Sequence, residues 1–132
     1  MTRARRAPTN ETRTVKTIAL KVLDNLPEEF RRLTENLTVC VEDEAPPGIY
    51  RPERQCRVLA YYVGTSLKDR SFFQPYGWPD QIVLLRGPIT RFAAASGKPL
   101  DEVVRICVLH ELAHLLGMTH ERMRELGYTF ED

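Results

Sequence analysis

The chain has 132 residues, a length that fits one domain of ordinary size with a single hydrophobic core. Hydrophobic residues make up 42% and charged residues 28%, which is typical of a globular protein and excludes a disordered, fibrous or membrane-spanning chain, so no membrane partner is expected. The net charge of +1 is unevenly placed, since residues 1–16 sum to +4 and the remainder to −3.

The charge distribution also bears on partners and compartment. Nucleic-acid binders concentrate Lys and Arg on one face, so the mildly acidic body predicts no nucleic-acid partner. We expect residues 1–13 to be a disordered basic tail and residues 14–132 to be the folded domain. No apolar segment follows the first arginines, so the tail does not read as a secretory signal, and cytoplasmic residence is expected. Three cysteines without CxxC spacing favour reduced thiols over a disulfide framework.

The N-terminal half predicts two helices and two strands. Apolar residues at helical spacing over 15–26 indicate a first helix, and a second, short helix is expected from Pro27 to about Asn36. The β-branched content of 37–42 and the apolar content of 57–63 indicate strands. Between them, residues 45–56 contain three prolines and are expected to be a surface loop.

The C-terminal half is dominated by one helix. A long loop over 65–80, with four aromatic residues at 72–78, precedes a predicted strand over Gln81–Arg86, which Gly87 and Pro88 close. A short helix is expected over 89–95. Apolar residues at helical spacing then predict a buried helix over 100–116, with acidic residues in its first turn and Gly117 after its end.

This last helix carries the chemistry. All three histidines of the chain fall in the string HELAHLLGMTH, which matches H-E-x-x-H-x-x-G-x-x-H at every fixed position. Residues four apart lie on one helix face, so His110 and His114 can converge on one ion. Gly117 can adopt the left-handed conformation that ends a helix, so that His120 returns as a third ligand. Three neutral ligands leave a fourth position open, as in catalytic zinc sites.

The residue after the first histidine completes the motif. In H-E-x-x-H sequences the glutamate is the general base that takes a proton from the water that the ion activates, which assigns that role to Glu111. The pattern therefore predicts one zinc ion per chain, held by His110, His114 and His120, and hydrolysis of a peptide or protein substrate. The plain alternative is that these are ordinary half-buried histidines with a solvated carboxylate.

Three further features have two interpretations each. Cys107 shares the helix face of the histidines and could be a ligand, although packing in the core is favoured. The aromatic loop over 72–78 could line substrate subsites or form a small core of its own. Tyr128 could stabilise an oxyanion, although packing near the chain end is favoured.

The sequence resembles small bacterial zincin-like metallopeptidases over about residues 14–132. The likeness rests on HELAHLLG, LPEEF, VLAYYVGTSLKDR, PDQIVLLRGPI and HERMRELGY. It implies an α+β fold: a small zincin-like domain in which a short mixed sheet packs on an active-site helix, at about residues 99–116, with helices N-terminal to it. Members of that family often carry aspartate where this chain has His120. The eleven-residue string is also similar to that of metzincins, but their methionine turn lies well downstream and only twelve residues follow His120 here, so we do not expect a true metzincin.

Two other functions remain open. A bacterial endoribonuclease family has a similar H-x3-H-x5-H string with glycine at the position of Glu111, but the glutamate and the acidic body favour peptide-bond hydrolysis. A metal-binding or partner-binding module without catalysis is the other alternative. For the peptidase, we expect the substrate to lie extended along an edge strand, with Gln81–Arg86 as the candidate. No feature of the sequence sets the oligomeric state.

Overall fold

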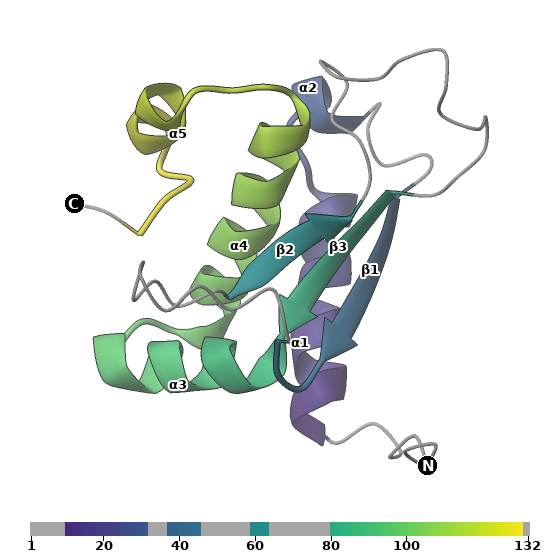
Figure 1. Ribbon diagram of the computed structural model, residues 1–132, viewed down its shortest axis with the longest axis vertical. Coiled ribbons are helices and arrows are strands. Elements are labelled where there is room, and N and C mark those ends of the chain that lie inside the picture. The colour runs from purple at the N-terminus through teal and green to yellow at the C-terminus, as the bar shows by residue number, and fades with distance from the viewer. Residues whose placement is uncertain (1–9, 32–36, 46–58, 64–79, 131–132) are drawn as a thin grey trace.

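The computed structural model describes residues 10–31, 37–45, 59–63 and 80–130 of the chain (Figure 1). In chain order, these residues form α1 (Asn10–Asp24), α2 (Glu28–Arg31), β1 (Leu37–Glu42), β2 (Ala60–Val63), β3 (Asp80–Leu85), α3 (Arg86–Ser96), α4 (Leu100–Leu115) and α5 (His120–Leu126). The fold is α+β, as the family resemblance implies. No helix in these ranges is both long and apolar enough to cross a membrane.

The three described strands form one mixed sheet in the order β1-β3-β2. Strand β3 pairs with β1 in parallel, with Val39 opposite Ile82, and with β2 in antiparallel, with Tyr62 opposite Ile82. The central strand is nearly continuous in apolar residues, and Ile82 to Leu85 are all buried. Such a run is typical of a strand that is covered on both sides.

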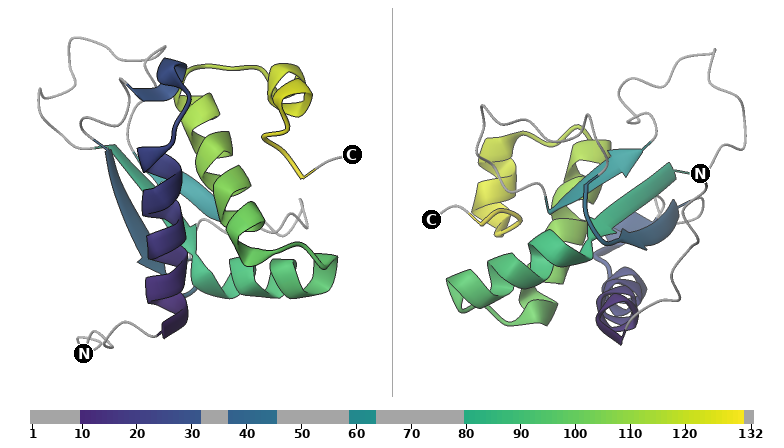
Figure 2. Two further views of the ribbon diagram at one scale, coloured as in Figure 1. Left: turned by 180° about the vertical axis from the view of Figure 1, so that it is seen from behind. Right: turned by 60° about the horizontal axis from the view of Figure 1, so that its bottom comes forward.

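Helices α1 and α4 cover the same face of this sheet (Figure 2). Buried residues of α1, β1, β3 and α4 meet there in one core cluster, which includes Val15, Val39, Ile82, Val104 and Val108. Helix α3 packs against α4 and crosses its beginning, whereas α5 follows the end of α4 (Figure 1). The core thus lies between the sheet and α4, the helix that carries the histidine motif.

Helix α4 is held on several sides because its sequence is apolar nearly all around. It buries nine of its 16 residues and contacts α1, α3, β2 and β3. Asp101 and Glu102 lie in its first turn, where negative charge interacts favourably with the helix dipole. A helix buried in this way is a rigid support for the side chains that it presents near its C-terminal end.

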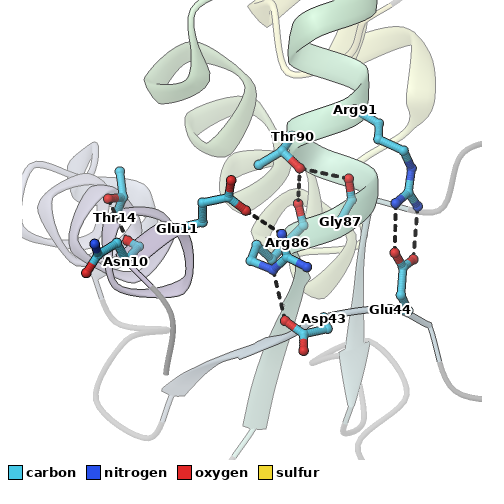
Figure 3. Close-up of polar contacts among 9 residues, drawn as sticks. All are labelled: Asn10, Glu11, Thr14, Asp43, Glu44, Arg86, Gly87, Thr90 and Arg91. Atoms are coloured by element: carbon cyan, nitrogen blue, oxygen red, sulfur yellow. Dashed lines mark hydrogen bonds and ion pairs between the residues drawn. The ribbon is translucent and has the colours of Figure 1, made fainter. Parts of the chain in front are cut away.

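Sequence and structure agree on most elements and differ at three places. β1 and α4 have the predicted bounds to within one residue, and α3 was predicted as a short helix. First, α1 begins at Asn10, so residues 10–13, predicted to be disordered, are helical. Glu11 forms an ion pair with Arg86, which joins the beginning of α1 to the beginning of α3 (Figure 3).

The second difference is at the end of β3. Strand β3 covers Asp80–Leu85, and Arg86, Gly87 and Pro88 begin α3 instead of closing the strand with a turn. Proline is compatible with the first turn of a helix, where its missing N–H has no partner to lose. The third difference is that Gln81–Arg86 is not an edge strand, because β3 is hydrogen-bonded on both sides.

Several predictions lie outside the described residues. These are the tail over 1–9, the continuation of the second helix over 32–36, most of the proline-containing loop, the beginning of the second strand at 57–58 and the aromatic loop over 72–78.

Candidate metal centre

Two of the three histidines lie on α4, one turn apart. The ring centroids of His110 and His114 are 4.6 Å apart, and their Nε2 atoms are separated by 2.9 Å. The predicted convergence of the two imidazoles through the i, i+4 spacing is therefore present in the fold. His114 is exposed and His110 half-buried, so the pair lies where the buried helix reaches the surface.

The third histidine reaches the pair through a tight turn. Gly117, at φ 74°, donates its N–H to the His114 carbonyl at 2.9 Å, and Met118 donates to the Ala113 carbonyl at 2.9 Å. These two bonds form a Schellman motif, which requires the left-handed residue that glycine supplies. Thr119 then caps α5, its hydroxyl accepting the Arg122 N–H at 3.1 Å.

This turn places His120 at the first position of α5. Its ring centroid lies 5.8 Å from that of His110 and 5.3 Å from that of His114. The three imidazoles of the sequence motif thus form one cluster, which we call the histidine cluster. The role that sequence reasoning gave to Gly117, to end the helix and return the chain, agrees with its conformation.

A backbone group that sequence reasoning missed completes the surroundings of His110. The Nδ1 atom of His110 lies 2.9 Å from the carbonyl oxygen of Tyr128. A carbonyl oxygen can only accept, so Nδ1 carries the hydrogen and, in the neutral ring, Nε2 has the free lone pair. That lone pair faces His114. Metal-ligating histidines usually donate their second ring N–H to such an oxygen.

The donor set fits zinc, although not in the side-chain positions as they stand. Among the described residues no group of three or more His, Cys, Asp or Glu side chains has the arrangement that an ion requires. In the pair on α4, the Nε2 atoms of His110 and His114 are 2.9 Å apart, within hydrogen-bonding distance of each other. Two nitrogens at ~2.05 Å from one tetrahedral ion would be about 3.3 Å apart. Holding one ion would therefore require the pair to open by about 0.4 Å.

Burial shifts two pKa values at this site. Desolvation lowers the pKa of His114, and the neighbouring His110 and His120 lower it further. Both effects keep the imidazole neutral, which is the form that binds a metal. Glu111 follows His110 on α4, and burial raises the pKa of its carboxyl to about 7. A carboxyl with that pKa can accept and release a proton near neutral pH.

Cys107 and Tyr128, for which the sequence allows two roles each, are both buried in the core. Cys107 is in the core cluster, and burial raises the pKa of its thiol, which agrees with packing rather than ligation. Met123 of α5 is fully buried in the same cluster. Tyr128 is 8% exposed, and its ring packs against Phe30 of α2 at a centroid distance of 5.9 Å, as its predicted packing role requires.

A cavity of about 250 Å³ lies between the end of α1 and the middle of α4. Leu26, Leu109 and Tyr128 are among the residues that line it, and none of the three histidines is. The cavity is therefore not a space that the three imidazoles line.

Comparison with known proteins bears on this cluster directly. The model of the zincin-like metallopeptidase family matches residues 34–128, which include the three described strands, α3, α4 and α5. The chain belongs to the zincin-like metallopeptidase family. Within this zincin-like domain, the match covers the histidine cluster, Glu111 and Tyr128, and leaves out α1 and α2. A search of curated proteins gives no significant match.

Proposed function

We propose that this zincin-like domain is a zinc-dependent metallopeptidase with one ion per chain, held by His110, His114 and His120. The observation that carries the proposal is the convergence of three imidazoles around the 2.9 Å pair of Nε2 atoms. The three ring centroids lie 4.6–5.8 Å from one another, and the exposure of His114 and His120 leaves a side open for substrate. Zinc, when bound, supplies the Lewis acidity that lowers the pKa of a water and polarises a carbonyl.

Glu111 is the general base in this proposal. Its carboxylate takes a proton from the attacking water and afterwards donates it to the nitrogen of the leaving amine. Burial supports this role, because a pKa near 7 makes both transfers feasible at neutral pH. A glutamate at this position, together with membership in a peptidase-like family, favours a peptide or protein substrate over RNA.

Substrate binding along a strand remains part of the proposal, but on a different strand. Within the described sheet β2 pairs only with β3, and it also packs on α4. It is the strand of the sheet nearest α5 (Figure 1). An extended peptide can add to the other edge of β2 through backbone hydrogen bonds. A crosslinkable peptide should label residues 60–63. Labelling confined to the β1 side of the sheet would contradict binding along β2.

The experiment compares metal content and peptide cleavage in the same preparations. Untagged wild type should contain one zinc per chain by native mass spectrometry, and His114→Ala should lose it. Glu111→Gln should keep the zinc but lose cleavage of a peptide library, because the amide cannot accept the proton. Glu102→Gln, at the other end of α4, is the matched control and should keep both.

Three outcomes would contradict the proposal. Wild type that neither contains zinc nor takes it up on addition would exclude the metal site. Zinc binding with cleavage unchanged in Glu111→Gln would show that Glu111 is not the general base. Zinc binding without cleavage in any preparation would leave a metal-binding module without catalysis.

A further inference from the structure

We propose that the backbone carbonyl of Tyr128 is a positioning group for the metal centre. It sets His110 in the Nδ1–H tautomer, with Nε2 free to bind, before any ion arrives. The inference rests on the proposed function, because it treats His110 as a ligand. It adds that the segment after α5, residues 127–130, is part of the metal centre although it contributes no ligand.

The position of this carbonyl is fixed by the end of α5. Gly127, at φ 78°, donates its N–H to Arg124, and Tyr128 donates to the Met123 carbonyl at 2.8 Å. This is a second Schellman motif, and it orients the peptide plane that follows it. The motif also brings Tyr128 and Met123, both in the core cluster, against the same interior. The carbonyl that reaches His110 thus follows a backbone turn that has two hydrogen bonds of its own.

Aromatic contacts on both sides anchor the segment. The Tyr128 ring packs against Phe30 of α2, with 5.9 Å between ring centroids. Two residues later, Phe130 meets Phe92 of α3 edge-on, with 4.7 Å between centroids. Such pairs contribute about 0.5–1.5 kcal/mol each beyond the area that they bury. Helices far apart in sequence therefore determine where the carbonyl lies.

The two histidine hydrogen bonds together imply unequal starting states for the ligands. With the hydrogen of His110 on Nδ1, its Nε2 accepts, so the 2.9 Å contact requires His114 to donate from its own Nε2. His110 is ready to bind an ion as it stands. His114 must first give up the Nε2 hydrogen and carry one on Nδ1, exchanging both with solvent. The carbonyl of Tyr128 thus removes the tautomer change from one ligand of the pair.

The experiment reads the tautomers directly and the metal affinity separately. Long-range ¹H–¹⁵N NMR of metal-free protein, well above the pKa of free imidazole, should show His110 as the Nδ1–H form and His114 as the Nε2–H form. In Tyr128→Ala, which removes the ring that anchors the segment, His110 should become a mixture of tautomers. Zinc affinity, measured by competition with a chelating dye, should fall about 10–100-fold, the usual effect of losing an outer-shell partner.

The controls separate positioning from general loss of stability. Tyr128→Phe keeps both the ring and the carbonyl and should bind zinc as wild type does. Val39→Ala, in the core on β1, should lower the unfolding temperature without changing the tautomers. If Tyr128→Ala does not fold, Phe30→Leu loosens the same ring from α2 and should show the same mixture of tautomers.

The outcomes distinguish this inference from the proposed function. A folded Tyr128→Ala in which His110 stays in the Nδ1–H form, or which binds zinc as tightly as wild type, overturns the positioning role. A wild type that binds no zinc but shows the two predicted tautomers supports the positioning of His110 while contradicting the metallopeptidase.

Discussion

Replacing Gly87 by alanine should destabilise the junction between β3 and α3, and the structure allows the cost to be worked out. A Cβ at this position would lie 2.9 Å from the backbone oxygen of Asp43 and closer still to Oε1 of Glu44. Both distances are too short for real contacts, so a neighbour must move. The Asp43 oxygen also accepts the Gly87 N–H at 2.9 Å, so it cannot retreat without weakening that bond.

The two neighbours differ in how easily they give way. The Glu44 carboxylate is exposed and can rotate, but it then loses its two hydrogen bonds to Arg91, at 2.7 and 2.9 Å (Figure 3). That exposed ion pair contributes at most about 1 kcal/mol. The shift at the Asp43 carbonyl adds about 0.5–1.5 kcal/mol for the strained hydrogen bond. Alanine is a better helix former than glycine, which offsets up to about 1 kcal/mol.

The net expectation is a loss of about 0.5–1.5 kcal/mol in the free energy of unfolding, at the lower end of the usual range for overpacking. For a domain of this size the loss lowers the melting temperature by about 2–6 °C. Urea unfolding with a chelator present measures it without a contribution from bound metal. In a Glu44→Ala background, Gly87→Ala should cost less than it does in the wild type but still destabilise the fold, because the contact with the Asp43 oxygen remains.

Gly97→Ala is the matched control, since its Cβ would meet no atom within 4 Å but its φ of +74° is unfavourable for alanine. It should cost about 1 kcal/mol through the backbone alone, whatever residue stands at position 44. A Gly87→Ala protein as stable as wild type would refute the steric argument.

Two further predictions concern the cap of α5 and a surface ion pair. Thr119→Ala removes the hydroxyl that accepts the Arg122 N–H and should cost about 1 kcal/mol in urea unfolding, with weaker zinc binding because His120 is the next residue; unchanged metal affinity would show that the cap does not hold the third ligand. The hydrogen bond from Arg91 lowers the pKa of Glu44, so this pair stabilises the fold above the ordinary glutamate pKa and loses its effect as pH falls through the lowered value. Arg91→Ala should therefore lose at most about 1 kcal/mol at neutral pH and nothing in acid, and a deficit that persists in acid would assign the effect to packing.

Local pattern was enough for the elements that are buried along one continuous face. β1 and α4 were predicted from residue type and spacing because both interact with the core over their whole length. The beginning of α1 was not predicted, because the apolar pattern of the helix does not extend to it. Its first residues are polar and carry no periodic signal, and the ion pair of Glu11 joins it to Arg86, 75 positions away in the chain. An interaction of that range has no local signature.

The order of the strands was missed although one signal for it was present. Residues 82–85 are uniformly apolar, and a run without alternation is typical of a strand covered on both sides. Its position directly before the buried helix suggested an edge beside the site instead. The strand at Ala60–Val63 is short and only half-buried, which is the pattern of an edge.

The candidate site shows the same difference: its side chains could be predicted from the sequence, and its backbone group could not. The spacing of the histidines and Gly117 could be read from the motif, because the chemistry of ligands and of a left-handed turn requires particular residue types. The backbone carbonyl that holds His110 could not be predicted in this way, because a residue of any type at position 128 supplies a carbonyl. The sequence shows only why the carbonyl lies there: glycine at 127 permits the turn, and aromatic residues at 30 and 128 meet in the core. Substitutions that spare every residue of the histidine motif can therefore still weaken the metal centre, by releasing a backbone group that the motif does not contain.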